Sequence, residues 1–191
     1  KAHMGDEKDS FTNVINKRYN PLIKAMRALS KPIIGKVNGV AAGAGCSLAL
    51  ACDIIVADEN AVFVEVFVNI GLVLDSGSSY FLPRIVGSKK AFELATMANK
   101  IKGSEAEALG IVNKAVPTEN LDETVKKYTD YYASAPTLAI GLMKKMQNAS
   151  STSTLDEMLG METEYQEIVG NSYDYNEGVA SFLEKRKPNF K

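Results

Sequence analysis

The sequence predicts a mixed α/β fold with a helical region at its C-terminal end. A strand-like run at residues 32–37 leads through a glycine-rich segment, residues 38–47, into an alanine-rich segment with good helix propensity. Short β-branched runs then alternate with helical patterns as far as residue 116, and after about residue 133 only helical patterns follow. We therefore expect a core at residues 1–133 and a helical region at residues 134–191.

The glycine-rich segment is the first candidate site. Its small residues let a ligand approach the backbone closely, and the N–H groups at the start of the following helix would point toward that ligand. Such a turn suits an anion, or an oxygen that becomes negative during a reaction. The alternative is that the glycines serve only close packing between strand and helix.

Composition and charge narrow the class of protein. The chain has 191 residues, 46% of them hydrophobic, and a net charge of −1, which suits a globular protein and gives no charge excess for binding nucleic acid or an anionic membrane. No apolar run reaches the ~20 residues of a membrane span, and no signal peptide is recognisable. Cys46 and Cys52 lie too far apart on one predicted helix for a disulfide. Two thiols favour a reducing compartment, so we expect the cytoplasm, or an organelle matrix in a eukaryote.

The N-terminal quarter predicts a loop and then a helix. Residues 1–10 are polar and lack periodicity, and they include His3, the only histidine. A single histidine excludes a Ser-His-Asp triad and a multi-histidine metal site, so no metal is expected. Apolar residues recur at helical spacing over residues 11–29, interrupted at Pro21, and Pro32 ends the helix.

Asp75 is the second candidate site. Predicted strands at residues 53–57 and 61–66 precede an apolar stretch that ends at Asp75, followed by Ser76 and Gly77. One interpretation makes Asp75 the N-cap of a helix that opens at about Ser76. The other places its carboxylate in a dry pocket as a general base.

The rest of the chain is predicted from periodicity and caps. A strand is expected at residues 111–116 and a short helix ended by glycine at residues 103–110. Longer helices are expected at residues 88–97, 119–133, 136–148, 154–169 and 176–187.

Four stretches together resemble the crotonase (enoyl-CoA hydratase/isomerase) superfamily. They are residues 31–45, which include Asn-Gly-Val-Ala-Ala-Gly-Ala-Gly; residues 51–55; residues 70–87, which end in Leu-Pro-Arg-Ile-Val-Gly; and residues 178–188. The resemblance implies a spiral of ββα units, truncated at its N-terminus here, with a C-terminal helical trimerisation region. It also implies an acyl-coenzyme A thioester as substrate with no further cofactor, and an enolate intermediate.

The resemblance gives the glycine turn a role. Family members hold the thioester oxygen with two backbone N–H groups, and the matching position for one of them is Ala44, flanked by Gly43 and Gly45 as substrate-binding residues. The other donor belongs to an N-terminal segment that relatives carry before the position of Lys1. We therefore expect this 191-residue chain alone to be nearly inactive.

The reaction follows from the acids that are present. Hydratases of the family use two glutamates, and the matching positions are Ser47 and Phe67, so a plain hydratase is not expected. Asp75 stands where several branches place a single acid, most like ring-1,2-epoxyphenylacetyl-CoA isomerases and Δ3,Δ2-enoyl-CoA isomerases. Glu65, two residues before Phe67, is the alternative acid. A 4-chlorobenzoyl-CoA dehalogenase is a further alternative, but those enzymes also use a tryptophan, which this chain lacks, and a histidine.

Residues of the C-terminal region match positions that reach coenzyme A on a neighbouring subunit. They are Phe182 and Lys185, spaced i,i+3 and expected on one helix face. The resemblance implies self-association as a trimer or hexamer. A non-catalytic acyl-CoA-binding subunit is the alternative from another functional class.

Overall fold

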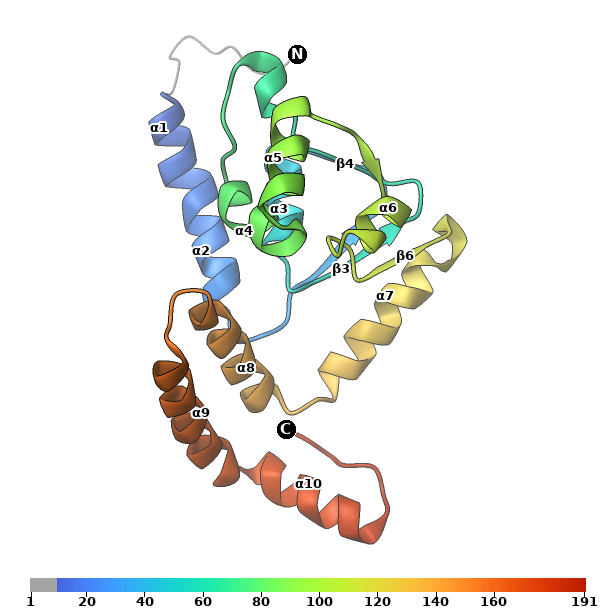
Figure 1. Cartoon of the computed structure of the whole chain (residues 1–191). Helices are drawn as coiled ribbons and strands as arrows, with labels where there is room; N and C mark the ends of the chain where they lie inside the picture. The colour runs from blue at the N-terminus through green and yellow to red at the C-terminus, as the bar shows by residue number, and fades with distance from the viewer. Residues whose placement is uncertain (1–9) are drawn as a thin grey trace. The chain divides into compact units, whose positions relative to one another are not determined.

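The computed structural model describes residues 10–191 (Figure 1). Of the predicted N-terminal loop, only Ser10 is among the described residues, and His3 lies outside them. The chain divides into two compact units: the first holds the segment up to Arg27 together with Gly35–Leu121, and the second holds Ala28–Ile34 and Asp122–Lys191. The boundary at residue 133 stays a prediction.

The N-terminal helical segment differs from its prediction at Pro21. The chain is helical from α1 (Phe11–Val14) through a π-helical turn, η1 (Ile15–Tyr19), into α2 (Asn20–Ala28). The helix continues through Pro21, and the π-helical turn directly before it changes the backbone hydrogen-bond pattern where Pro21 lacks an N–H.

Two small sheets form the framework of the first unit. The strands of one, in the order β1-β3-β6, are Ile34–Val37, Ile54–Asp58 and Lys114–Val116. The strands of the other, in the order β2-β4-β5, are Val40–Ala42, Val62–Val64 and Ile101–Lys102. β3 pairs with β6, and β2 with β4, in parallel, whereas β4 and β5 are antiparallel. β2 was not predicted, because its three residues lie within the glycine-rich segment.

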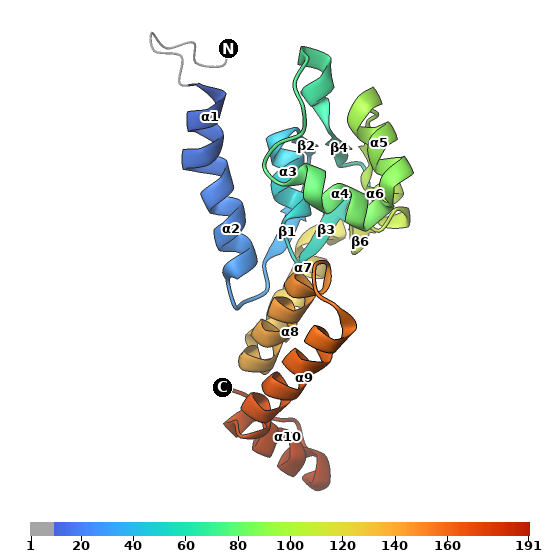
Figure 2. The same ribbon diagram turned by 60° about the vertical axis from the view of Figure 1, so that its left-hand side comes forward.

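Short helices complete the first unit (Figure 2). They are α3 (Ala44–Leu50), the 3-10 helix η2 (Val66–Ile70), α4 (Ser78–Val86), α5 (Ser88–Met97) and α6 (Gly103–Ala108). The core contains side chains from both sheets and from α3, α4 and α5, among them Leu50, Phe63, Leu82, Leu94 and Ile101. This packing fixes the start of α3 and the loop before α4, the two places that carry the candidate site.

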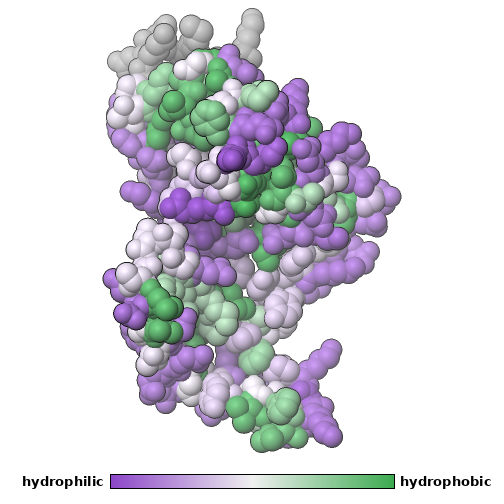
Figure 3. All heavy atoms as spheres, viewed as in Figure 1, coloured by the Kyte–Doolittle hydropathy of each residue, from purple (hydrophilic) through white to green (hydrophobic). Residues whose placement is uncertain are grey.

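The second unit is helical, as predicted. Its helices are α7 (Thr118–Ala133), whose first turn belongs to the first unit, α8 (Thr137–Ser150), α9 (Leu155–Gly170) and α10 (Tyr173–Glu184). A capping box formed by Thr154 and Glu157 starts α9. Hydrophobic surface is visible on these helices (Figure 3), where large exposed side chains include Leu138, Met143, Leu155, Leu159, Val179, Phe182 and Leu183. Across residues 10–191, every helix is too short or too polar to cross a bilayer.

Candidate active site

The glycine turn places the Ala44 N–H at the start of a helix. Gly43 has φ 52° and ψ −123°, a backbone conformation that L side chains rarely adopt. A Cβ there would also lie 3.3 Å from Val66 Cγ2. The Gly43 N–H donates to the Val64 carbonyl at 2.9 Å, which ties the turn to β4. Ala44 is the first residue of α3, so its N–H has no acceptor within that helix and is available to a ligand.

The loop before α4 leaves the Asp75 carboxylate without a capping role. The N-cap interpretation is wrong: α4 begins at Ser78, and Gly77, with φ 91°, occupies the N-cap position. The chain turns through two left-handed residues before the helix starts, so Asp75 contributes only its backbone carbonyl, which accepts the Ser78 N–H at 3.0 Å. Asp75 Oδ1 is buried and has no hydrogen-bond partner among residues 10–191.

Ser76 holds this loop in an unfavourable backbone conformation. Its φ is 51°, in the left-handed region, although it carries a side chain. Its hydroxyl is buried and has no hydrogen-bond partner in the described part of the chain. A left-handed residue other than glycine costs about 1 kcal/mol, and such conformations cluster at functional sites.

A buried carboxyl, Glu65, lies behind the turn and the loop. It is 3% exposed, and its Oε1 lies within hydrogen-bond distance of Ser78 Oγ, at 2.7 Å. Ser78 Oγ lies 2.7 Å from Ser47 Oγ, and Ser47 Oγ lies 3.2 Å from the Gly43 carbonyl oxygen, within hydrogen-bond distance. The Ser47–Ser78 contact therefore connects the helix that carries Ala44 to the helix that follows Asp75.

The electrostatics of this cluster favour a neutral Glu65. Burial raises the pKa of Glu65; hydrogen bonds from Ser78 and Cys46 oppose the rise, and the negative charge of Asp75 adds to it. Burial also raises the pKa of the Cys46 thiol, so Cys46 is a neutral neighbour. Two carboxyl groups placed close together in different surroundings are typical of acid–base sites.

Ser47 and Phe67 occupy the two positions where hydratases of the family carry glutamates, and neither is an acid. Ser47 belongs to the hydroxyl chain just described. Phe67 is buried, and its ring lies 3.6 Å from where a Cβ on Gly43 would be. Sequence reasoning kept Glu65 only as a minor alternative. The signal that could have raised its rank is a carboxyl directly after the apolar strand residues Phe63 and Val64.

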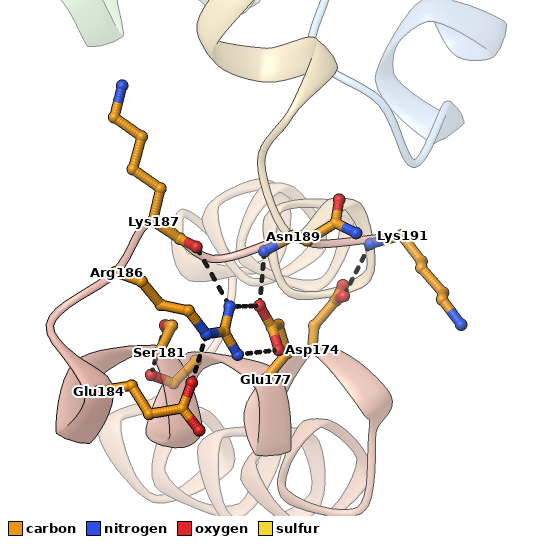
Figure 4. A network of polar contacts seen from close by, with 9 residues as sticks. Asp174, Glu177, Ser181, Glu184, Arg186, Lys187, Asn189 and Lys191 are labelled. Carbon is orange, nitrogen blue, oxygen red and sulfur yellow. Dashed lines mark hydrogen bonds and ion pairs between the residues drawn. The ribbon is translucent and has the colours of Figure 1, made fainter.

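The C-terminal residues predicted to bind coenzyme A lie in the second unit. Phe182 is 83% exposed on α10. The expectation that Lys185 shares its helix face is wrong, because α10 ends at Glu184 and Lys185 is its left-handed C-cap, with φ 54°. The segment after Lys185 folds back along α10 (Figure 4): Arg186 pairs with Glu177 at 2.5 and 2.9 Å, and the Asn189 N–H donates to Glu177 at 2.7 Å.

The site residues thus fall into two groups. Gly43, Ala44, Gly45 and Asp75 belong to the first unit, whereas Phe182 and Lys185 belong to the second. No cluster of three or more histidine, cysteine, aspartate or glutamate side chains that could hold a metal occurs in residues 10–191.

Comparison with known proteins decides the family. The profile of the enoyl-CoA hydratase/isomerase family matches residues 1–191. The chain belongs to this family. The 1,2-epoxyphenylacetyl-CoA isomerase of Escherichia coli K12 is 42% identical over 176 residues, which are 92% of this chain and 67% of that protein. A probable enoyl-CoA hydratase of Rhodobacter capsulatus is 38% identical over 95% of this chain and 70% of its own length.

Solved structures agree with the crotonase fold expected of this family. An enoyl-CoA hydratase from Bacillus anthracis superposes with a TM-score of 0.92 at 29% identity, over 98% of this chain and 72% of that one. An enoyl-CoA hydratase from Polaromonas sp. JS666 gives a TM-score of 0.86 at 34% identity, over 90% of this chain and 66% of that one. The chain thus spans about two thirds of the length of these relatives.

Proposed function

We propose that this chain belongs to an acyl-CoA isomerase that works with one carboxylate base, Asp75. Asp75 Oδ1 carries the proposal, because it is buried without a hydrogen-bond partner in the described residues. A carboxylate oxygen left without fixed donors is ready to accept a proton from a bound substrate. The similarity to the 1,2-epoxyphenylacetyl-CoA isomerase supports this reaction class.

The mechanism uses the two parts of the site in turn. The Ala44 N–H binds the thioester oxygen and stabilises the negative charge that develops on it. Asp75 removes a proton from C2 of the acyl group, which gives an enolate. The same carboxyl then returns the proton at C4, and the double bond moves by one position. Opening of an epoxide ring next to the thioester would use the same enolate and the same oxyanion donor.

A hydratase is the second candidate function, because relatives named as hydratases match at similar identity. Addition of water requires a second group that holds the water, and Glu65 is the acid nearest in sequence to the position of the family's second glutamate. Glu65 Oε2, like Asp75 Oδ1, has no hydrogen-bond partner in the described residues, but Glu65 is only 3% exposed whereas Asp75 is partly exposed. The burial of Glu65 favours the isomerase over the hydratase.

Two assays distinguish these functions, and both use the chain extended by the N-terminal segment that relatives carry, because the 191-residue chain alone is expected to be nearly inactive. A Δ3-enoyl-CoA is converted to the conjugated Δ2 product, which is followed by the increase in ultraviolet absorbance. Crotonyl-CoA is offered separately, and hydration is followed by the loss of that absorbance. We expect isomerisation to exceed hydration by at least about 100-fold, since Glu65 is buried away from water and leaves Asp75 as the acid that can act. Faster hydration than isomerisation would contradict the proposal.

We also propose that Phe182 and Lys185 contribute to coenzyme A binding and that the chain self-associates as a trimer or hexamer. The exposed apolar side chains of α8, α9 and α10 support association. Lys185→Ala is expected to weaken coenzyme A binding about threefold to tenfold at low salt, because an exposed ammonium–phosphate contact is screened by water. A stable monomer at micromolar concentration in sedimentation would contradict the association.

A further inference from the structure

Four oxygen atoms form an unbroken line from the buried acid to the glycine turn. They are Glu65 Oε1, Ser78 Oγ, Ser47 Oγ and the Gly43 carbonyl oxygen, separated by 2.7, 2.7 and 3.2 Å. Glu65, Ser78 and Ser47 are all buried. The line ends on the carbonyl of the Gly43–Ala44 peptide, whose N–H is the proposed oxyanion donor.

The number of hydrogens in this line depends on the protonation of Glu65. The two serine hydroxyls carry one hydrogen each, whereas the line has three oxygen–oxygen contacts. With Glu65 ionised, Ser78 donates to Glu65 and Ser47 donates to Ser78, which leaves the Gly43 carbonyl without a hydroxyl donor. With Glu65 protonated, its O–H can donate to Ser78, Ser78 to Ser47 and Ser47 to Gly43, so all three contacts become hydrogen bonds.

We propose that Glu65 is a positioning residue that acts on the oxyanion donor through the hydroxyls of Ser78 and Ser47. In its protonated form it directs the Ser47 hydroxyl onto the Gly43 carbonyl. A hydrogen bond to a peptide carbonyl polarises the whole peptide, so the Ala44 N–H on the same peptide becomes a stronger donor. The role of Ala44 rests on the proposed function, whereas the coupling between Glu65 and the Gly43–Ala44 peptide does not.

The surroundings of Glu65 agree with a neutral acid. The titratable groups that face it are the Cys46 thiol of α3 and the Asp75 carboxyl of the loop before α4, and neither supplies a positive charge. A cavity of about 10 Å³ lies beside Glu65. It is lined by Cys46, by Asn99 and otherwise by apolar side chains, so no cation faces Glu65 from it. Desolvation without a cation favours the protonated carboxyl.

Nuclear magnetic resonance tests the coupling without any acyl-CoA. The ¹³Cδ resonance of Glu65 and the ¹⁵N resonance of Ala44 are followed in the purified chain as pH rises. We expect both to change with one midpoint, above the ordinary glutamate value of about 4.3. The Ala44 resonance is expected to move upfield as Glu65 ionises and Ser47 turns away from Gly43. Separate midpoints, or a Glu65 that titrates at its ordinary value, would overturn the proposal in the unmodified protein.

Three variants separate the hydroxyl chain from a through-space effect of charge. Ser47→Ala and Ser78→Ala each interrupt the line, so the Ala44 resonance should no longer follow the titration of Glu65. Glu65→Gln keeps a donor toward Ser78 and should hold Ala44 at its low-pH position at every pH. Persistence of the Ala44 titration in Ser47→Ala would overturn the proposal. Glu107 is the internal control: it accepts the Ala115 N–H at 2.8 Å, so the Ala115 resonance should titrate with Glu107 in all variants.

Kinetics connect the coupling to the reaction. Removal of one oxyanion donor lowers kcat by about 10²–10³-fold, and weakening a donor should lower it less. We therefore expect Ser47→Ala to lower kcat about tenfold while KM changes little. In Glu65→Gln, kcat should lose the pH dependence that the titration of Glu65 imposes on the unmodified protein. If the chain extended by the N-terminal segment of relatives neither binds nor converts an acyl-CoA, the proposed function fails, and the resonance experiment on the 191-residue chain still decides the coupling. An unchanged kcat in Ser47→Ala would overturn the effect on catalysis.

Discussion

Glu65 and Glu177 are two carboxyls of one chain that the protein treats in opposite ways. Glu65 is buried among hydroxyls, a thiol and a second carboxyl, and burial raises its pKa. Glu177 lies near the surface of α10 with the Arg186 guanidinium and the Asn189 N–H on its oxygens, and these hydrogen bonds lower its pKa to about 2. Figure 4 shows how closely the guanidinium faces that carboxylate.

The difference shows that partners, more than residue type, determine what a carboxyl can do. Glu177 is ionised and fully engaged by donors, so it fastens the C-terminal segment to α10 and has no capacity for chemistry. Glu65 lacks a cation and can carry the proton that completes a chain of hydroxyls. Asp75 is a third case: like Glu65 it has one oxygen buried without a partner in the described residues, but its side chain is partly exposed whereas that of Glu65 is buried.

The largest expected effect tests whether Asp75 is the reactive carboxyl. Asp75→Asn preserves size, and because Asp75 is not an N-cap, the fold should survive. In the chain extended by the N-terminal segment of relatives, we expect kcat for Δ3-enoyl-CoA isomerisation to fall by at least about 100-fold while acyl-CoA affinity changes little. Glu107→Gln, which alters a carboxylate engaged by Ala115 and Lys114, is the matched control and should change kcat by less than about twofold. Near-normal turnover by Asp75→Asn would place the base elsewhere.

The second prediction concerns how the free energy of unfolding depends on pH. Glu65 and Glu177 should contribute slopes of opposite sign. The raised pKa of Glu65 means that the folded state keeps a proton which the unfolded chain releases. The free energy of unfolding therefore declines as pH rises from about 4.3 through the raised pKa, by at most about 1.4 kcal/mol per pH unit. Glu177 contributes stability above about pH 4.3 that is lost as pH falls toward 2.

Urea unfolding at a series of pH values measures both slopes. Glu65→Gln should remove the decline on the neutral side, and Glu177→Gln should reduce the loss on the acid side. Each variant serves as the control for the other. If Glu65→Gln leaves the neutral slope unchanged, Glu65 is ionised in the folded protein.

The smallest expected effect is the response to salt. Raising the ionic strength to about 1 M shortens the screening length to ~3 Å, which weakens exposed ion pairs and leaves buried interactions nearly unchanged. The pKa of Glu177 should therefore rise toward its ordinary value by roughly half a unit, and the pKa of Glu65 should stay constant. Carboxyl ¹³C titrations at two salt concentrations measure both. Equal shifts at the two residues would contradict the assigned burial of Glu65.

Sequence alone could predict the elements that local pattern determines. The helices α5, α7 and α9 begin and end within one or two residues of their expected bounds, because periodicity and caps such as that of Thr154 are local signals. β2 was missed because its strand character comes from pairing with β4, about twenty residues away in the chain. The end of α10 was misplaced because the Arg186–Glu177 pair holds the following segment against the helix.

The residues of the candidate site likewise fall into those that local sequence could identify and those that depend on tertiary contacts. The glycine turn and Asp75 could be identified from sequence motifs and the family resemblance, and their roles stay predictions. The importance of Glu65 could not be judged, because its hydrogen-bond partner Ser78 lies 13 residues on, and Ser78 contacts Ser47, 31 residues back along the chain. Whether a carboxyl is buried beside hydroxyls or exposed to water is a property of tertiary packing.

The backbone of Ser76 has a consequence for how this protein would evolve under selection for heat resistance alone. Glycine at this position would adopt φ 51° without the side-chain penalty and remove a buried hydroxyl that has no partner in the described chain. Ser76→Gly is therefore expected to raise the melting temperature by a few degrees, as a gain of about 1 kcal/mol would. A library screened only for thermostability should accumulate glycine here and, by loosening the loop that holds Asp75, lose turnover in the same clones.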